Sequence, residues 1–312
     1  MKKIRILGTG LSGLVGSRVV ELLADQYEFQ NLSRETGFDI ADRESTGKII
    51  KDSNALIVLH LAAKTDVDGC EKDKEDDLKN YYLANIPVHQ CVENNGQSAW
   101  EINVLGTKNI ADACSLAGKR LIYISTDFVF DGERNDSRPY LEEDIPNPMN
   151  WYGQTKYEGE KIVKSYNLPW TILRIAYPYR SNFSRNDFVR TVIGRLKKGE
   201  KLNMVLDHVM SPTFIDDIAK ALDVIVKTSS TGIFHMVGSQ FVTPYEAASI
   251  IADIFNFEKS LVDKTTMQEF FANRAQRPFY LGLENDKIQK LGVKMMTFEE
   301  GIIEVKRQMS NF

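Results

Sequence analysis

A glycine-rich stretch, GTGLSGLVG at residues 8–16, constrains the fold of this chain more than any other feature. It follows the short apolar run Ile4–Leu7 and leads into an apolar helical pattern at Gly13–Ala24. Glycine permits a tight turn and lets backbone N–H groups approach a pyrophosphate, which the N-terminus of the following helix stabilises. This context predicts a dinucleotide-binding loop. The loop residues expected to contact the cofactor are Gly10, Leu11, Ser12 and Gly13.

Short apolar, β-branched runs alternate with helical patterns through the first half of the chain. The expected strands are Ile4–Leu7, Tyr27–Leu32, Ala55–Leu61, Arg120–Ser125, Trp170–Ile175 and Ile233–Val237. The expected helices are Gly13–Ala24, a variable stretch near 73–95, Trp100–Ala117 and Trp151–Tyr166. Such alternation predicts an α/β fold of the Rossmann type, a doubly wound parallel sheet with its ligands at the carboxyl ends of the strands.

The pattern changes after residue 176, where helical segments dominate and only short strands separate them. We therefore expect a smaller, mainly helical substrate-binding lobe beside the sheet. The dinucleotide-binding domain is expected to comprise residues 1–175 and roughly 210–240. The substrate-binding lobe is expected to comprise residues 176–209 and roughly 241–312.

The end of the second expected strand bears on the choice of dinucleotide. An acidic residue there holds the ribose hydroxyls of NAD, whereas an arginine accommodates the extra phosphate of NADP. The strand ends in Leu32, Ser33 and Arg34, with no acid among the three. This favours NADP(H) over NAD(H), and the alternative is that Arg34 is an ordinary surface residue.

The stretch WYGQTKYEGEK at 151–161 contains two tyrosines, each four residues before a lysine. At about 100° per residue, Tyr152 and Lys156 share one helix face with Gly159 and Val163. Tyr157 and Lys161 fall on the opposite face, where Lys164, Glu158 and Glu160 are also expected. The first pair is therefore expected to point inward, and a buried lysine requires a reason because an unpaired ammonium is costly to bury. A neighbouring ammonium lowers the pKa of a phenol, which would make Tyr152 a usable proton donor.

Charge and composition exclude several classes of function. The net charge is −4, which gives no reason to expect nucleic acid or an anionic membrane surface as a partner. The three cysteines are too few and too scattered for a disulfide framework or a zinc site, so no metal site is expected. The chain lacks a signal-peptide pattern and an apolar stretch of about 18 residues, and a cytoplasmic location is expected.

The chain resembles the extended short-chain dehydrogenase/reductase superfamily, and more narrowly the dTDP-4-dehydrorhamnose reductases. The motifs that carry the resemblance run in order along nearly the whole length. They are GTGLSGLVG at 8–16, HLAAKTDVD at 60–68, INVLGTKNIADAC at 102–114, YISTDFVFDG at 123–132, YGQTKYEGE at 152–160, SPTFIDDIAKAL at 211–222 and RPFYLGLENDKIQKLGV at 277–293.

The resemblance implies a role for individual residues. Tyr152 would be the acid/base, Lys156 its partner, and Thr126 the hydroxyl that holds the substrate carbonyl. Further cofactor contacts would come from Asp39, Ile40, Leu61, Ala62 and Ala63, besides Tyr152 and Lys156. Substrate contacts would come from Thr65, Val67, Thr126, Asp127 and Tyr177. The implied reaction is hydride transfer to a 4-keto carbon while Tyr152 protonates the developing alkoxide.

Three departures from the family pattern concern the substrate side. The stretch near 81–99 is longer than usual, Lys64 replaces an uncharged residue, and His208 stands where the family carries Gln. A hydrogen-bonded structural role is expected for His208, with a catalytic base as the alternative. Phe128 follows Thr126 and Asp127 where related 4,6-dehydratases carry a glutamate base, so reduction is favoured over dehydration.

The leading hypothesis is an NADPH-dependent reductase of a nucleotide-linked 4-keto-6-deoxy sugar. One alternative is a nucleotide-sugar epimerase of the same superfamily, which regenerates its cofactor in each cycle. Another is a non-catalytic, NADP-binding regulatory subunit that serves a partner enzyme. A homodimer is an open alternative to a monomer.

Overall fold

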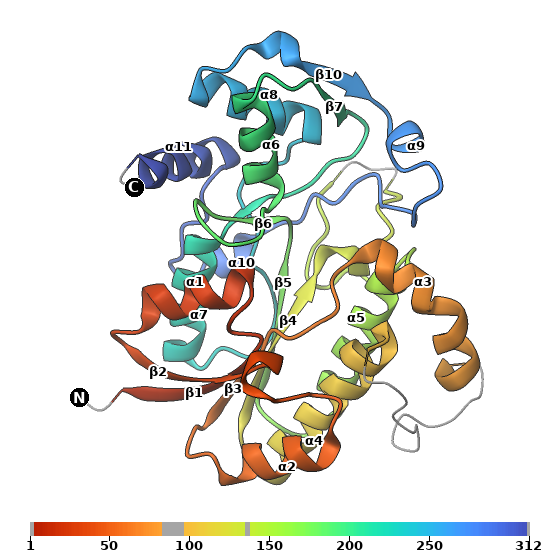
Figure 1. Cartoon of the computed structure of the whole chain (residues 1–312). Coiled ribbons are helices and arrows are strands. Elements are labelled where there is room, and N and C mark those ends of the chain that lie inside the picture. Colours follow the sequence, from red (N-terminus) through yellow and green to blue (C-terminus); the bar gives the residue numbers. More distant parts are fainter. Residues whose placement is uncertain (1–2, 83–96, 135–137, 311–312) are drawn as a thin grey trace. The chain divides into compact units, whose positions relative to one another are not determined.

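The protein is described here by a computed structural model that covers residues 3–82, 97–134 and 138–310 (Figure 1). The chain forms two compact units. Unit 1 comprises Met1–Val129, Pro146–Leu173 and Ser230–Ile233, and unit 2 comprises Phe130–Ile145, Arg174–Ser229 and Phe234–Phe312. The two units are defined by how the chain packs and not by what each unit binds. The expected bounds of the dinucleotide-binding domain and the substrate-binding lobe therefore stay a prediction.

A six-stranded sheet organises unit 1. Its strands are β1 (Ile4–Thr9), β2 (Tyr27–Leu32), β3 (Ile57–His60), β4 (Arg120–Thr126), β5 (Trp170–Ile175) and β9 (Gly232–His235). Their order is β2-β1-β3-β4-β5-β9, and β1 pairs in parallel with both β2 and β3. The chain winds outward in both directions from β1 and β3, which is the arrangement in which α/β proteins bind ligands at the carboxyl ends of the two central strands. The predicted Rossmann-type fold class is confirmed.

Helices cover the sheet because its central strands are apolar on both faces. All four residues of β3 are buried, as expected of a parallel strand between two helical layers. The helices of unit 1 are α1 (Leu14–Leu23), α2 (Arg43–Asp52), α3 (Val67–Asp77), α4 (Thr107–Leu116) and α5 (Trp151–Ser165). Figure 1 shows α2, α4 and α5 side by side, and Ile50, Ile110 and Val163 from these helices share a core with Val58 and Leu121.

Unit 2 is mainly helical. Its elements are β6 (Pro178–Tyr179), α6 (Phe188–Lys197), β7 (Leu202–Val205), β8 (Thr213–Phe214), α7 (Ile215–Thr228), α8 (Pro244–Phe255), β10 (Val262–Thr265), α9 (Met267–Phe270), α10 (Asp286–Gln289) and α11 (Phe298–Met309). The strands form two small parallel pairs, β7 with β10 and β6 with β8. Helices α6, α8 and α11 enclose an apolar cluster that includes Val189, Ile251 and Phe298. These elements form the helical region expected after residue 176.

Several expected elements differ from the structure. Helix α2 was not expected, because only Ile49 and Ile50 interrupt its polar sequence; Asp42 caps it by accepting a hydrogen bond from the Ser45 amide. The helix expected at Trp100–Ala117 begins as a π-helical segment, Glu101–Gly106, before α4. The variable helix near 73–95 begins earlier, with α3 at Val67, and its part at 83–96 lies outside the described residues.

None of the helices in the described ranges combines the length and the apolar character needed to cross a membrane. The longest helix, α5, has 15 residues and exposes charged side chains along one face.

Candidate active site

The loop between β1 and α1 depends on glycine for its shape. Gly10 has a φ of +69°, and a Cβ atom there would lie 2.8 Å from the backbone nitrogen of Ala62. A Cβ atom on Gly16 would lie 2.6 Å from the carbonyl oxygen of Gly10. In the part of the chain that the structure describes, no side chain caps the first turn of α1, which begins after Gly13. The loop therefore presents backbone N–H groups at a helix N-terminus, an arrangement that suits an anionic phosphate.

The other expected cofactor residues border this loop. Leu11 is buried, Ser12 is half-buried and Gly13 is exposed. Leu61 follows β3, and its amide donates a 3.2 Å hydrogen bond to the carbonyl oxygen of Thr9 at the end of β1. The half-buried residues Ala62 and Ala63 come next. The structure thus brings the ends of β1 and β3 together as the motif spacing predicts.

Arg34 lies directly after β2 and forms an ion pair that the sequence did not reveal. Its guanidinium is 3.5 Å from the carboxylate of Asp39 and donates a 2.8 Å hydrogen bond to Gln97. About half of the Arg34 side chain is exposed. An acidic residue, Asp39, therefore does lie near the end of β2, although it follows Arg34 by five residues in the sequence. Ile40 is buried, and its carbonyl oxygen accepts a hydrogen bond from Asn109.

Two residues at the start of helix α5, Asn150 and Gly153, allow the helix to pack closely against the segment that follows β4. Asn150 caps the helix by accepting a 2.9 Å hydrogen bond from the amide of Gly153. A Cβ atom on Gly153 would lie 2.1 Å from the carbonyl oxygen of Phe128, so only glycine allows this close approach. These two positions were not singled out from the sequence, although an Asn directly before a helical pattern, here Asn150 before Trp151, is a helix-start signal.

The inward face of α5 carries the expected pair. Tyr152 and Lys156 are buried, whereas Tyr157 is half-buried and Lys161 is exposed. Lys161 forms a 2.6 Å ion pair with Glu158 on the outer face. The prediction of the two faces is confirmed for both tyrosine and lysine pairs, but it was wrong for Glu160, which is fully buried rather than on the solvated face.

Lys156 is buried with specific partners for its ammonium. Its Nζ atom donates a 2.8 Å hydrogen bond to the carbonyl oxygen of Ile124 and lies 4.1 Å from the centre of the Tyr123 ring. Burial lowers the pKa of Lys156 to about 7, and the charge of Glu160 opposes this shift. These contacts supply the reason that a lysine on an inward face requires.

Tyr152 lies beside Thr126, the last residue of β4. Burial raises the pKa of Tyr152 above its ordinary value of 10, and a hydrogen bond with the Thr126 side chain only partly opposes that rise. The expected lowering of this pKa was therefore wrong in direction, because loss of hydration dominates and the charge of Asp127 adds to the rise. The ring of Phe128 lies edge-on to the Tyr152 ring at 5.7 Å. The phenol stays protonated at neutral pH in this environment.

Asp127 follows Thr126 and is also buried, with 2% of its surface exposed. Its Oδ1 atom accepts a 2.9 Å hydrogen bond from the Thr126 hydroxyl. Burial raises the pKa of Asp127 to about 7. Thr126, Asp127 and Tyr152 thus form one buried polar cluster between β4 and α5, and Lys156 is buried on the same face of α5 as Tyr152.

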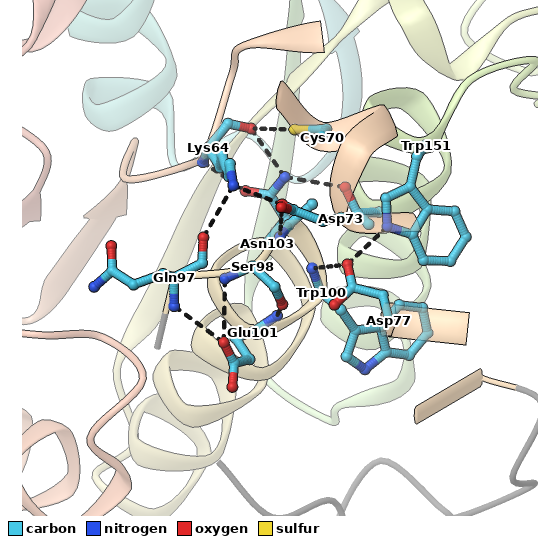
Figure 2. A network of polar contacts seen from close by, with 12 residues as sticks. Lys64, Cys70, Asp73, Asp77, Gln97, Ser98, Trp100, Glu101, Asn103 and Trp151 are labelled. Atoms are coloured by element: carbon cyan, nitrogen blue, oxygen red, sulfur yellow. Dashed lines mark hydrogen bonds and ion pairs between the residues drawn. The ribbon is translucent and has the colours of Figure 1, made fainter. Parts of the chain in front are cut away.

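A polar network, shown in Figure 2, holds the segment after β3. The Lys64 ammonium is 2.6 Å from Asp73, which also accepts a 2.8 Å hydrogen bond from the amide of Ala99. The backbone of Lys64 exchanges two hydrogen bonds with the amide side chain of Asn103, which donates another to Thr155 on α5. The expected substrate residues Thr65, exposed, and Val67, half-buried at the start of α3, follow directly.

Tyr177 and His208 contact each other within unit 2. The Tyr177 hydroxyl is 2.8 Å from Nε2 of His208, whose Nδ1 is 2.7 Å from the carbonyl oxygen of Pro278. Because that carbonyl only accepts, Nδ1 carries the proton and Nε2 accepts from Tyr177. Burial lowers the pKa of His208 to about 4. His208 is therefore hydrogen-bonded on both sides, as expected, and Tyr177 has a φ of +40°, an uncommon value for a residue other than glycine.

The comparison with known families follows the same motifs. The sequence model described as the RmlD substrate binding domain matches residues 4–85 and 81–311. The chain belongs to this family. The two matched segments overlap at residues 81–85.

The RmlD relatives carry two kinds of name. A solved dTDP-4-dehydrorhamnose reductase from Bacillus anthracis, in complex with NADP, has a TM-score of 0.84 and 29% identity over 98% of this chain and 100% of that one. The dTDP-4-dehydrorhamnose reductase of Aggregatibacter actinomycetemcomitans is 28% identical over 92% of each chain. Methionine adenosyltransferase 2 subunit beta of Mus musculus is 31% identical over 96% of this chain and 86% of its own length. The expected membership of the extended dehydrogenase/reductase superfamily is confirmed, and the RmlD relatives include named reductases and a named subunit of another enzyme.

Proposed function

We propose that this RmlD-family protein is an NADPH-dependent reductase of a nucleotide-linked 4-keto-6-deoxy sugar. The observation that carries the proposal is that Thr126, at the end of β4, and Tyr152 and Lys156, on one face of α5, are all buried, with Tyr152 close enough to Thr126 to interact with its hydroxyl. It places a phenol proton next to a hydroxyl, at the carboxyl end of a central strand where α/β proteins bind ligands.

Each buried side chain has a task in this reaction. The bound nicotinamide supplies the hydride. The Thr126 hydroxyl holds the substrate carbonyl oxygen, and Tyr152 donates its proton to that oxygen as negative charge develops. Lys156 holds the nicotinamide ribose. General acid catalysis of this kind contributes about 10²–10⁴ in rate. The raised pKa of Tyr152 ensures that the proton is present at neutral pH before the reaction begins.

The loop around Gly10 and the side chain of Arg34 support the choice of cofactor. Gly10 has a positive φ, and within the described residues no side chain caps the first turn of α1. Both features suit a pyrophosphate at the helix N-terminus. Arg34 is half exposed and within reach of the same edge of the sheet, so it offers a guanidinium to a 2′-phosphate. The carboxylate of Asp39 competes with the 2′-phosphate for that guanidinium and so lowers the affinity gained from the phosphate.

Phe128 separates reduction from dehydration. Its side chain is buried edge-on against Tyr152 and carries no group that abstracts a proton. A reductase needs only the proton donor, whereas a 4,6-dehydratase also needs a base beside it. An epimerase would regenerate its cofactor and would therefore not consume NADPH.

A second function is a regulatory subunit, as an alternative to catalysis. The 31% identity to a subunit of methionine adenosyltransferase supports it, since that relative spans nearly all of this chain. Such a protein would bind a dinucleotide and a partner enzyme without turning over a sugar.

The deciding experiment is NADPH oxidation by the purified chain with a panel of nucleotide-linked 4-keto sugars. We expect one NADPH consumed per sugar reduced, with Tyr152→Phe as the inactive control. Absence of oxidation with every sugar, together with retained NADPH binding and capture of a methionine adenosyltransferase catalytic subunit, would support the regulatory function instead.

A further inference from the structure

Asp127 has an unusual environment for a carboxyl group. Its Oδ1 atom accepts a hydrogen bond from the hydroxyl of Thr126. Its Oδ2 atom is buried and lacks any hydrogen-bond partner among the described residues. A buried carboxylate oxygen without a donor is costly, so native proteins seldom keep one unless the group has a use.

The surroundings of Asp127 permit both of its protonation states. Burial favours the neutral acid, while the Thr126 hydroxyl and the backbone N–H groups of Asp127 and Phe128 favour the carboxylate. The titratable group that faces it from the neighbouring helix is Tyr152 on α5. With a pKa of about 7, Asp127 exchanges a proton near neutral pH.

The geometry points to a proton relay: Asp127 stores a proton and returns it to Tyr152 through the Thr126 hydroxyl after each reduction. The relay rests on the proposed reductase function. When Tyr152 has given its proton to the alkoxide, a tyrosinate remains. The Thr126 hydroxyl transfers its proton to the tyrosinate oxygen, and the Asp127 carboxylic acid replaces it on Thr126. Asp127 is then a carboxylate and recovers a proton from solvent, so one proton is taken up for each turnover.

Stopped-flow measurement of NADPH absorbance tests the relay with Asp127→Asn. Asparagine keeps the size of the side chain and an acceptor for Thr126 but stores no proton. Tyr152 is protonated beforehand, so the first turnover of the variant should be faster than its later turnovers. Later turnovers should be slower by about 10²-fold, the lower range for loss of a positioned acid. Asp25→Asn, which replaces an exposed aspartate in the turn after α1, should keep the wild-type rate in all turnovers.

Two kinetic outcomes would overturn the relay. Wild-type speed in all turnovers of Asp127→Asn would show that Tyr152 recovers its proton by another path. A first turnover as slow as the later ones would place Asp127 in the reduction step or in the shape of the site. An equally slow rate in Asp25→Asn would show that the effect is not specific to Asp127 and would also count against the relay.

A measurement without substrate separates the relay from the proposed function. Carbon-13 NMR of aspartate carboxyl groups should show one signal that titrates near pH 7 in the wild type and is missing in Asp127→Asn. Absence of that signal would overturn the proton store whatever the protein reduces. If the signal is present but the wild type oxidises no NADPH with any keto sugar, the reductase function fails while the proton store stands.

Discussion

Replacing Asp127 with Asn should change how the stability of the protein depends on pH. The pKa of this carboxyl is about 7 in the folded protein, against an ordinary value of 3.8. The folded state therefore binds the proton more tightly than the unfolded state. The stabilisation from that proton is fully present below about pH 4 and is lost as the pH rises through about 7.

The size of the effect follows from the two pKa values. They differ by about three pH units, and each unit corresponds to about 1.4 kcal/mol, which gives about 4 kcal/mol over the whole range. Between about pH 5 and about pH 8 the expected loss is about 2–3 kcal/mol. Asparagine does not titrate, so the free energy of unfolding of the variant should rise relative to wild type by that amount across this interval.

Urea denaturation of both proteins at several pH values, followed by circular dichroism, measures the difference. Asp25→Asn is a suitable control because Asp25 is exposed in the turn after α1. It shows how much of any change comes from replacing an exposed aspartate with asparagine. If the gap between wild type and Asp127→Asn is constant with pH, the carboxyl is not held as a neutral acid, and the reasoning about its burial fails.

Further predictions concern the candidate site. Tyr152→Phe should lower kcat about 10²–10⁴-fold with unchanged NADPH affinity by calorimetry, whereas Tyr157→Phe on the outer face should leave steady-state kinetics within about twofold. Damage mainly from Tyr157→Phe would contradict the assignment of faces. Arg34→Ala should weaken NADPH binding and leave NADH binding nearly unchanged; equal losses would refute a phosphate contact. Asp39→Asn should tighten NADPH binding by up to about fivefold, the range for an exposed ion pair, and weaker binding would show that Asp39 itself holds the cofactor.

Patterns that depend on local spacing were readable from the sequence. The bounds of β2 and β5 agree with those expected: β2 alternates apolar and polar residues, and β5 is a mainly apolar run. The glycine loop and the inward face of α5 were also predictable, since both follow from fixed geometry along one segment. The face prediction located Lys156 in the core, although helical periodicity alone does not reveal the Ile124 carbonyl that binds it.

Features that depend on distant segments were not readable. Helix α2 is too polar to show a periodic pattern, and it forms because Ile50 packs against α4 in the core. Glu160 is buried although its sequence neighbours are polar, because α5 is covered on more than one side. The pKa of Tyr152 depends on how completely the phenol is dehydrated, which is a property of the packed structure.

The two functions proposed for this RmlD-family chain place different requirements on the buried polar residues between β4 and α5. Dinucleotide binding by a regulatory subunit needs the Gly10 loop and the surface around Arg34, but it gains nothing from dehydrating ionisable groups. In this protein Lys156 and Asp127 are both buried, and burial shifts the pKa of each toward 7 from opposite directions. Such a pair is costly to retain and is typical of sites that move protons. These shifts therefore support the proposed reductase function over a role in binding alone.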